Sequence, residues 1–163
     1  MAKYLLSGFS DYAQGFGAWS DGDSILGFRL NSDQLRTVGS VKLLLVVLAA
    51  TEPDSFEIRY HGGVLKGTYT GWPSTVTGAF EVHLPIDRGN AVQAYRIQTL
   101  VRHVPAQLIM NSKDTRRMGL GIRAVALSSC PASDDLYGEN AKQLPPCAKA
   151  DEILKIKPVP KWP

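Results

Sequence analysis

The sequence contains no apolar run long enough to cross a membrane. The longest such run covers residues 43–50, which is eight residues, whereas a membrane-spanning helix needs about 20. We therefore expect no membrane span and interpret this run as a buried strand. Residues 1–8 also lack the apolar segment of a secretory signal peptide, so either the protein stays where it is made or the chain is a fragment or a mature form.

The motifs of several enzyme classes are missing as well. There is neither a Gly-x-Ser-x-Gly nucleophile elbow nor a Walker loop. The three histidines, at positions 61, 83 and 103, lack the spacing of the common metal sites, and each falls on or near a strand face that is expected to be polar. We interpret them as surface histidines, assign no catalytic or metal-ligating residue, and do not favour an enzyme.

Two carboxylates, Asp21 and Asp23, stand two positions apart around Gly22 and resemble the start of a calcium loop. The remaining ligands of an EF-hand are absent from the residues that follow. A turn between two strands explains these residues more simply. No cofactor is therefore predicted, and calcium is kept as the alternative.

The sequence has a small excess of positive charge, and this excess is confined to the C-terminal part of the chain. The formal net charge is +3. Residues 142–163 contain five Lys and two acidic residues, whereas residues 1–141 contain 13 basic and 13 acidic residues. A protein that binds nucleic acid normally carries a basic stripe on its folded body. The neutral body therefore argues against a nucleic-acid partner.

Apolar and polar side chains alternate over several segments. Phe56, Ile58 and Tyr60 alternate with polar residues, and the same period of two recurs at residues 80–84 and 94–104. This period is typical of a strand with one buried face. Further strands are expected at residues 3–9, 24–31, 40–50, 63–70 and 118–128. Residues 41–50 alternate little, which predicts a central strand with both faces covered.

Turn residues separate these segments at the spacing of a sandwich. Gly62-Gly63 predicts a tight hairpin between residues 54–61 and 63–70, and Asp21-Gly22 predicts another turn. A short helical turn is expected at residues 32–36, capped by Ser32 or Asp33. With about eight strands and no strong amphipathic helix, the sequence predicts an all-β fold, a jelly-roll-like sandwich of two antiparallel sheets.

The composition changes near residue 130. Prolines at positions 145, 146, 158, 160 and 163 exclude a continuous helix or a central strand from the last part of the chain. We predict a β-sandwich domain at residues 1–129 and a Pro- and Lys-rich extension at residues 130–163, ordered but mostly irregular. The extension is expected to pack on its own body or on a partner, with Ile153, Ile156 and Trp162 as apolar anchors for a partner.

Cys130 and Cys147 are the only cysteines. Two ligands are too few for a structural zinc site, so the pair forms either a disulfide or two free thiols. We favour the disulfide, although no signal peptide is visible. A disulfide would favour an extracytoplasmic or surface location; the compartment is otherwise unknown.

Two tryptophans, Trp19 and Trp72, fall in predicted turns. An exposed Trp in a sandwich loop offers a flat face on which a sugar ring can stack, and nearby Asp and Arg side chains can bond the hydroxyls. The alternative is that the ring covers one end of the core; this is favoured for Trp19, and the two alternatives are equal for Trp72. The candidate ligand-binding residues are Trp72, Trp19, Asp21, Asp23, Arg96, Arg102 and Arg123.

Two segments resemble a known family when they are read together. Gly8-Phe9-Ser10 and Gly17-Ala18-Trp19-Ser20-Asp21-Gly22, with the strand at residues 25–30, form the first, and residues 114–127 (DTRRMGLGIRAVAL) form the second. Over residues 7–129 the chain resembles a bacterial jelly-roll-like β-sandwich domain found beside membrane-bound glycosyltransferases and phosphoglycerol-transferase-like proteins. That domain is similar to carbohydrate-binding modules. The resemblance implies glycan binding, although this sequence has neither their transmembrane helices nor a catalytic domain.

Two functions follow from the sequence. The first is a non-catalytic, carbohydrate-binding-like β-sandwich module. The alternative is a structural or accessory subunit of a larger assembly that docks through its C-terminal arm. The expected partner is accordingly a glycan or a protein, and both homo- and hetero-oligomers remain open.

Overall fold

The structure is a computed structural model that describes residues 5–9, 18–48, 54–69, 77–99, 113, 120–138 and 147–154. In residues 5–9 and at the ends of several strands, only the backbone is described. These residues form ten strands and one short helix, in the order β1 (Leu5–Phe9), β2 (Ala18–Arg29), α1 (Ser32–Thr37), β3 (Ser40–Leu48), β4 (Asp54–Tyr60), β5 (Gly63–Tyr69), β6 (Thr77–Leu84), β7 (Val92–Thr99), β8 (Gly121–Ser128), β9 (Ser133–Gly138) and β10 (Glu152–Leu154).

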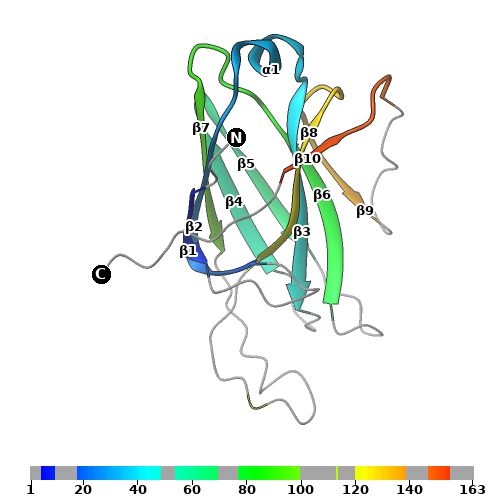
Figure 1. The fold of residues 1–163 in the computed structure, drawn as a ribbon. Helices are drawn as coiled ribbons and strands as arrows, with labels where there is room; N and C mark the ends of the chain where they lie inside the picture. The colour runs from blue at the N-terminus through cyan, green and yellow to red at the C-terminus, as the bar shows by residue number, and fades with distance from the viewer. Residues whose placement is uncertain are drawn as a thin grey trace.

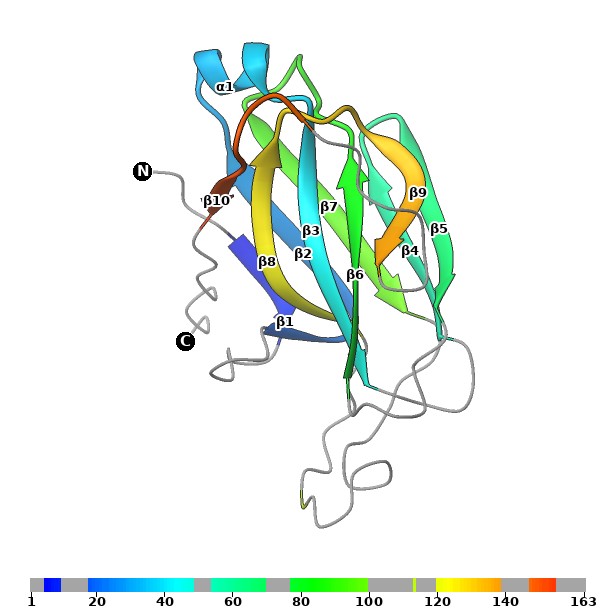
Figure 2. The same cartoon turned by 90° about the vertical axis from the view of Figure 1, so that its right-hand side faces the viewer.

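The strands form two antiparallel sheets that pack face to face, so the predicted all-β sandwich is confirmed. The first sheet has the order β5-β4-β7-β2-β1, and the second has the order β10-β8-β3-β6-β9. Figure 1 shows the two layers from the side, and Figure 2 shows the second sheet in front of the first. Among the described residues, no helix is long and apolar enough to span a membrane.

Strand β2 belongs to both sheets. Its first residues, Ala18 and Trp19, pair with β8, whereas Asp23 to Arg29 pair with β7 of the first sheet. Between these two parts Gly22 has a φ of 115°, a backbone conformation that side-chain-bearing residues rarely adopt. The predicted turn at Asp21-Gly22 is therefore wrong: the glycine bends one continuous strand from one sheet to the other.

The core lies between the sheets and is built from the alternating residues. Phe56 of β4 meets Phe80 of β6 across it, with ring centroids 5.3 Å apart. Strand β3 is central, between β8 and β6, as predicted. Its inward residues Val41, Leu43 and Leu45 have no exposed surface, and burying a side chain of this kind stabilises the fold by about 1.5–3 kcal/mol.

The two local predictions have different outcomes. The hairpin is confirmed, because Tyr60 pairs with Gly63 across a two-residue loop in which Gly62 has a φ of 87°. The helix forms at the expected place, but its N-cap is Asn31 rather than Ser32 or Asp33. The Asn31 side chain accepts from the Gln34 backbone, and the Gln34 side chain accepts from the Asn31 backbone. Only a cap at Asn31 places a glutamine three residues later, where this reciprocal pair can form.

The C-terminal extension contributes to the second sheet. Strand β9 pairs with β6, and the three residues of β10 pair with β8. The disulfide between Cys130 and Cys147 is formed, with 5.4 Å between the two Cα atoms. The extension thus adds two short strands to a segment that was expected to be mostly irregular, and part of it packs on its own body.

Candidate functional site

Two of the candidate ligand-binding residues meet on the outer surface of the first sheet. Arg96 on β7 donates from Nε to Oδ1 of Asp23 on β2 at 2.8 Å and from Nη2 to Oδ2 at 2.6 Å. About half of each side chain is exposed. The two residues are diagonal neighbours, because Asp23 pairs with Gln98 and Ile25 pairs with Arg96. Hydrogen bonding to Asp23 raises the pKa of Arg96 above its ordinary value.

The same surface carries three more charged residues from β4 and β5. Glu57 binds Arg59 at 3.2 Å and Lys66 at 3.3 Å. The strand register places Lys66, Glu57, Gln98 and Asp23 in one row across the sheet. We call this surface the open face, and it consists of Asp23, Glu57, Arg59, Lys66, Arg96 and Gln98.

A second row on this face combines charge with apolar surface. Arg59 lies directly opposite Arg96, and the row is flanked by Val64 on β5 and Ile25 on β2. Val64 and Ile25 are 37% and 45% exposed. The open face therefore presents planar guanidinium and carboxylate groups beside exposed aliphatic side chains, on the outside of a sheet.

The other candidate residues fall elsewhere or outside the described part. Arg123 is exposed on β8 of the second sheet, where the pairing with β3 shifts register. Trp19 lies in β2 rather than in a turn, and only its backbone and that of Asp21 are described. Trp72 and Arg102 lie outside the described residues, as do Ile156 and Trp162 of the extension.

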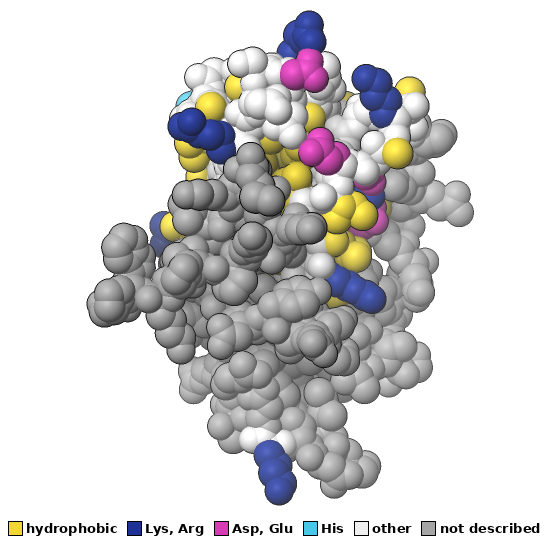
Figure 3. Space-filling view, in the orientation of Figure 1, with side chains coloured by type: hydrophobic (Ala, Val, Ile, Leu, Met, Phe, Trp, Pro, Cys, Tyr) yellow, Lys and Arg dark blue, Asp and Glu magenta, His cyan; other side chains and the backbone are white. Residues whose placement is uncertain are grey.

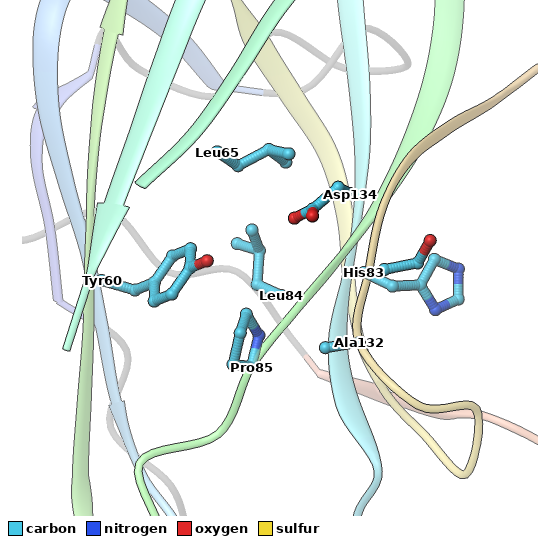
Figure 4. Close-up of a pocket in the computed structure, with 8 residues that line it drawn as sticks. Tyr60, Leu65, His83, Leu84, Pro85, Ala132 and Asp134 are labelled. Carbon is cyan, nitrogen blue, oxygen red and sulfur yellow. The ribbon is translucent and has the colours of Figure 1, made fainter. Parts of the chain in front are cut away.

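Two hollows lie at one end of the sandwich, on either side of Tyr60 and Pro85, with volumes of about 120 and 230 Å³. Figure 4 shows the smaller hollow between Tyr60 and Leu65 of the first sheet and Leu84 and Asp134 of the second. Both are smaller than typical ligand pockets of about 300–1,000 Å³, so neither is the preferred site.

The polar groups of the larger hollow hold the loop between β6 and β7. Gln93 accepts from the Asp87 backbone at 2.8 Å and donates to the carbonyl oxygens of Asp87 and Asn90. The Tyr95 hydroxyl donates to the Pro85 carbonyl at 2.8 Å, and burial raises the pKa of this tyrosine. These polar groups are therefore used to stabilise the loop between β6 and β7, and we assign no ligand to the hollow beside it.

The outer surface of the second sheet differs from the open face because it is covered. We call it the covered face, formed by Ser40, Lys42, Glu81, His83 and Tyr137. His83 is only 2% exposed, and Figure 4 shows its ring on the other side of β6 from Leu84. Tyr137 of β9 packs edge-on against this ring at 5.3 Å between centroids. The interpretation of His83 as a surface histidine is therefore wrong, whereas His61 is exposed as expected.

Part of the extension reaches across the covered face. Lys42 forms an ion pair with Asp151, the residue before β10, and lies 3.9 Å from Glu81. The backbone at Ser129 and Cys130 is held close to the residue before β3 as well. A Cβ atom at Gly39 would lie 2.6 Å from the Ser129 carbonyl oxygen, so only glycine allows this approach.

The covered face contains a serine, a histidine and a carboxylate together, yet it does not form a nucleophilic site. Ser40 Oγ lies 3.3 Å from Nδ1 of His83, and Glu81 lies 3.9 Å from Nε2. Ser40 has no exposed surface, so no substrate can reach its hydroxyl. Burial lowers the pKa of His83, outweighing the opposite effect of Glu81, and keeps the ring neutral as a packing residue.

A metal site is not assembled within the described part of the chain, which holds no group of three or more ligating side chains. Both oxygens of Asp23 accept hydrogen bonds from Arg96, which makes this carboxylate a poor candidate for calcium.

The open face is therefore the strongest candidate for a functional site. Sequence reasoning found Asp23 and Arg96 but missed Glu57, Arg59 and Lys66 as partners in that site, because the strand register that joins them is not visible in the sequence.

Comparisons of this chain with known protein families, curated proteins and solved structures found no match.

Proposed function

We propose that this chain is a non-catalytic β-sandwich module that binds a carbohydrate through the open face. The supporting observation is the two-point contact between Arg96 and Asp23, beside exposed Ile25. Sugars offer neighbouring hydroxyls to planar polar groups and C–H faces to apolar side chains. A fixed guanidinium–carboxylate pair supplies donors and acceptors at a defined spacing without further ordering of either side chain.

The charge distribution favours a glycan over nucleic acid. Figure 3 shows basic and acidic side chains scattered over the described part of one side, with no continuous basic stripe there. The disulfide supports an oxidising, extracytoplasmic compartment. Trp72, Trp19, Asp21 and Arg102 remain predicted contributors to binding, whereas Arg123 lies on β8 of the second sheet and would not contact a ligand on the open face.

The experiment is a binding measurement on a panel of neutral and acidic oligosaccharides with the wild-type chain and two variants. Arg96→Gln removes a charged donor from the open face, and its affinity should fall at least about tenfold. Arg36→Gln is the matched control, because Arg36 also pairs with an aspartate, Asp33, at an exposed site on α1 away from the open face. The proposal fails if the wild type binds no member of the panel or if the two variants bind alike.

A second candidate function is that of an accessory subunit that docks through its C-terminal arm. The observation in its favour is Ile153, which is 74% exposed on the edge strand β10. This function requires a protein partner or self-association, whereas the binding module works as a monomer. Sizing of the purified chain separates the two.

A further inference from the structure

The open face contains an arrangement that sheets normally avoid. Arg59 of β4 and Arg96 of β7 lie directly opposite each other on neighbouring strands. Like charges in this position destabilise a sheet, because their Cβ atoms are only about 4.5–5.5 Å apart. Both side chains remain more than half exposed, so packing in the core does not explain why two arginines lie opposite each other.

Within the part of the chain that the structure describes, each of the two arginines contacts one carboxylate. Arg59 contacts Glu57, and Arg96 contacts Asp23. Glu57 also binds Lys66, so three cations share two carboxylates within this cluster. A guanidinium has five N–H donors, and the contacts above occupy two of those on Arg96 and one on Arg59. Guanidinium donors therefore remain available in the middle of the face, where the described cations outnumber the described carboxylates.

We propose, on the basis of the carbohydrate-binding function above, that the open face recognises an acidic sugar and that Arg59 and Arg96 together bind the carboxylate of a uronic acid. A carboxylate is planar and matches the fork of a guanidinium in a two-point contact. Its negative charge complements the excess of cations over carboxylates among the described residues of the open face. The flanking Ile25 and Val64 cover the apolar face of the sugar rings on either side.

Charge balance distinguishes a uronic acid from a denser polyanion. A nucleic acid presents closely spaced phosphates and is bound by many basic residues. The open face has Lys66, Arg59 and Arg96 but also Asp23 and Glu57, which would repel neighbouring phosphates. The face therefore suits a glycan whose carboxylates alternate with neutral hydroxyl-bearing surface.

The test uses oligogalacturonate and oligoglucuronate, each compared with its own methyl ester, which keeps the sugar and removes the charge. We expect each acid to bind at least about tenfold more tightly than its ester, because a charge-assisted contact is lost. Arg59→Gln should remove this preference while leaving weak binding of the ester. Arg59→Lys keeps the charge without the planar fork and should restore the preference only in part. Arg36→Gln on α1 should bind like the wild type.

The outcomes separate this proposal from the function on which it rests. If neither acid binds better than its ester, while Arg96→Gln still weakens binding of neutral oligosaccharides, the acidic ligand is wrong and the carbohydrate-binding function stands. If no oligosaccharide binds, both are wrong. If single-stranded DNA or a sulfated oligosaccharide binds as tightly as the uronic acids and depends equally on Arg59, the face attracts polyanions in general and the carboxylate site is overturned.

Discussion

The outer faces of the two sheets arise from the same alternating sequence pattern, but one is exposed to solvent and the other is buried. Both consist of residues that alternate with core residues along their strands. On the open face, Arg59 and Arg96 have side chains that are 57% and 51% exposed. On the covered face, Ser40 and His83 are almost wholly buried. A period of two therefore tells which residues leave the core, but not whether water or protein meets them.

What covers the second sheet comes from the end of the chain. Tyr137 of β9 packs on His83, and the segment around β10 reaches Lys42 through Asp151. Among the described residues, no such layer lies over Arg59 and Arg96 of the first sheet, whose side chains are more than half exposed. We infer that the covered face stabilises the fold, while the open face is available for a ligand.

The largest expected loss of stability comes from removing the disulfide that holds the C-terminal extension on the second sheet. Replacing both cysteines, Cys130→Ala with Cys147→Ala, opens a loop of 17 positions and should lower the free energy of unfolding by about 3 kcal/mol. Urea unfolding under non-reducing conditions measures the loss, and glycan binding of the folded fraction should be unchanged. A loss of glycan binding at full folding would show that the two faces are not independent.

Removing an ion pair should lower the free energy of unfolding by a smaller amount, and this amount should differ between the two faces. Lys42→Met leaves Asp151 and Glu81 without their cation in a partly buried setting and should cost about 1–2 kcal/mol. Arg96→Met removes an exposed pair and should leave the unfolding midpoint unchanged within error. Thermal unfolding of the two variants side by side gives the comparison. Equal destabilisation would contradict the distinction between the faces.

The smallest effect is a pH dependence that belongs to the covered face. Burial lowers the pKa of His83 below 6.5 in the folded state, so the unfolded chain binds a proton more readily. Stability is therefore complete above about pH 6.5 and decreases as the pH falls below that value, until the folded-state pKa is reached. Urea titrations over the range from about pH 7.5 to about pH 5, which brackets the ordinary histidine pKa of about 6.5, should show that the unfolding free energy of His83→Gln depends less steeply on pH. An unchanged slope would mean that another group is responsible.

The sequence predicted the parts of the fold that depend on local pattern. The central position of β3 followed from the weak alternation of residues 41–50, and the β4–β5 hairpin followed from Gly62-Gly63. Features that depend on distant parts of the chain were not predictable in this way. Gly22 looks like a turn glycine until the pairing of β2 with two different sheets is known.

The candidate site shows the same division. Asp23 and Arg96 were selected as polar residues near predicted turns or on polar strand faces, and the structure brings them together. The partnership with Arg59 depends on the register between β4 and β7, which no local pattern specifies. Strand β9 was missed because most of its six residues are polar or glycine, and β10 because it has only three residues. Both strands also form at sheet edges, where one neighbour suffices.

The most direct test of the proposed function is to locate the bound oligosaccharide on the wild-type chain by NMR chemical-shift mapping. We predict that the shifted amide signals will lie in residues 57–59 of β4 and 96–98 of β7, with none in residues 125–127 of β8 or 152–154 of β10. Shifts confined to β8 and β10, or to the end hollows around Tyr60 and Pro85, would contradict the assignment of the open face as the binding site.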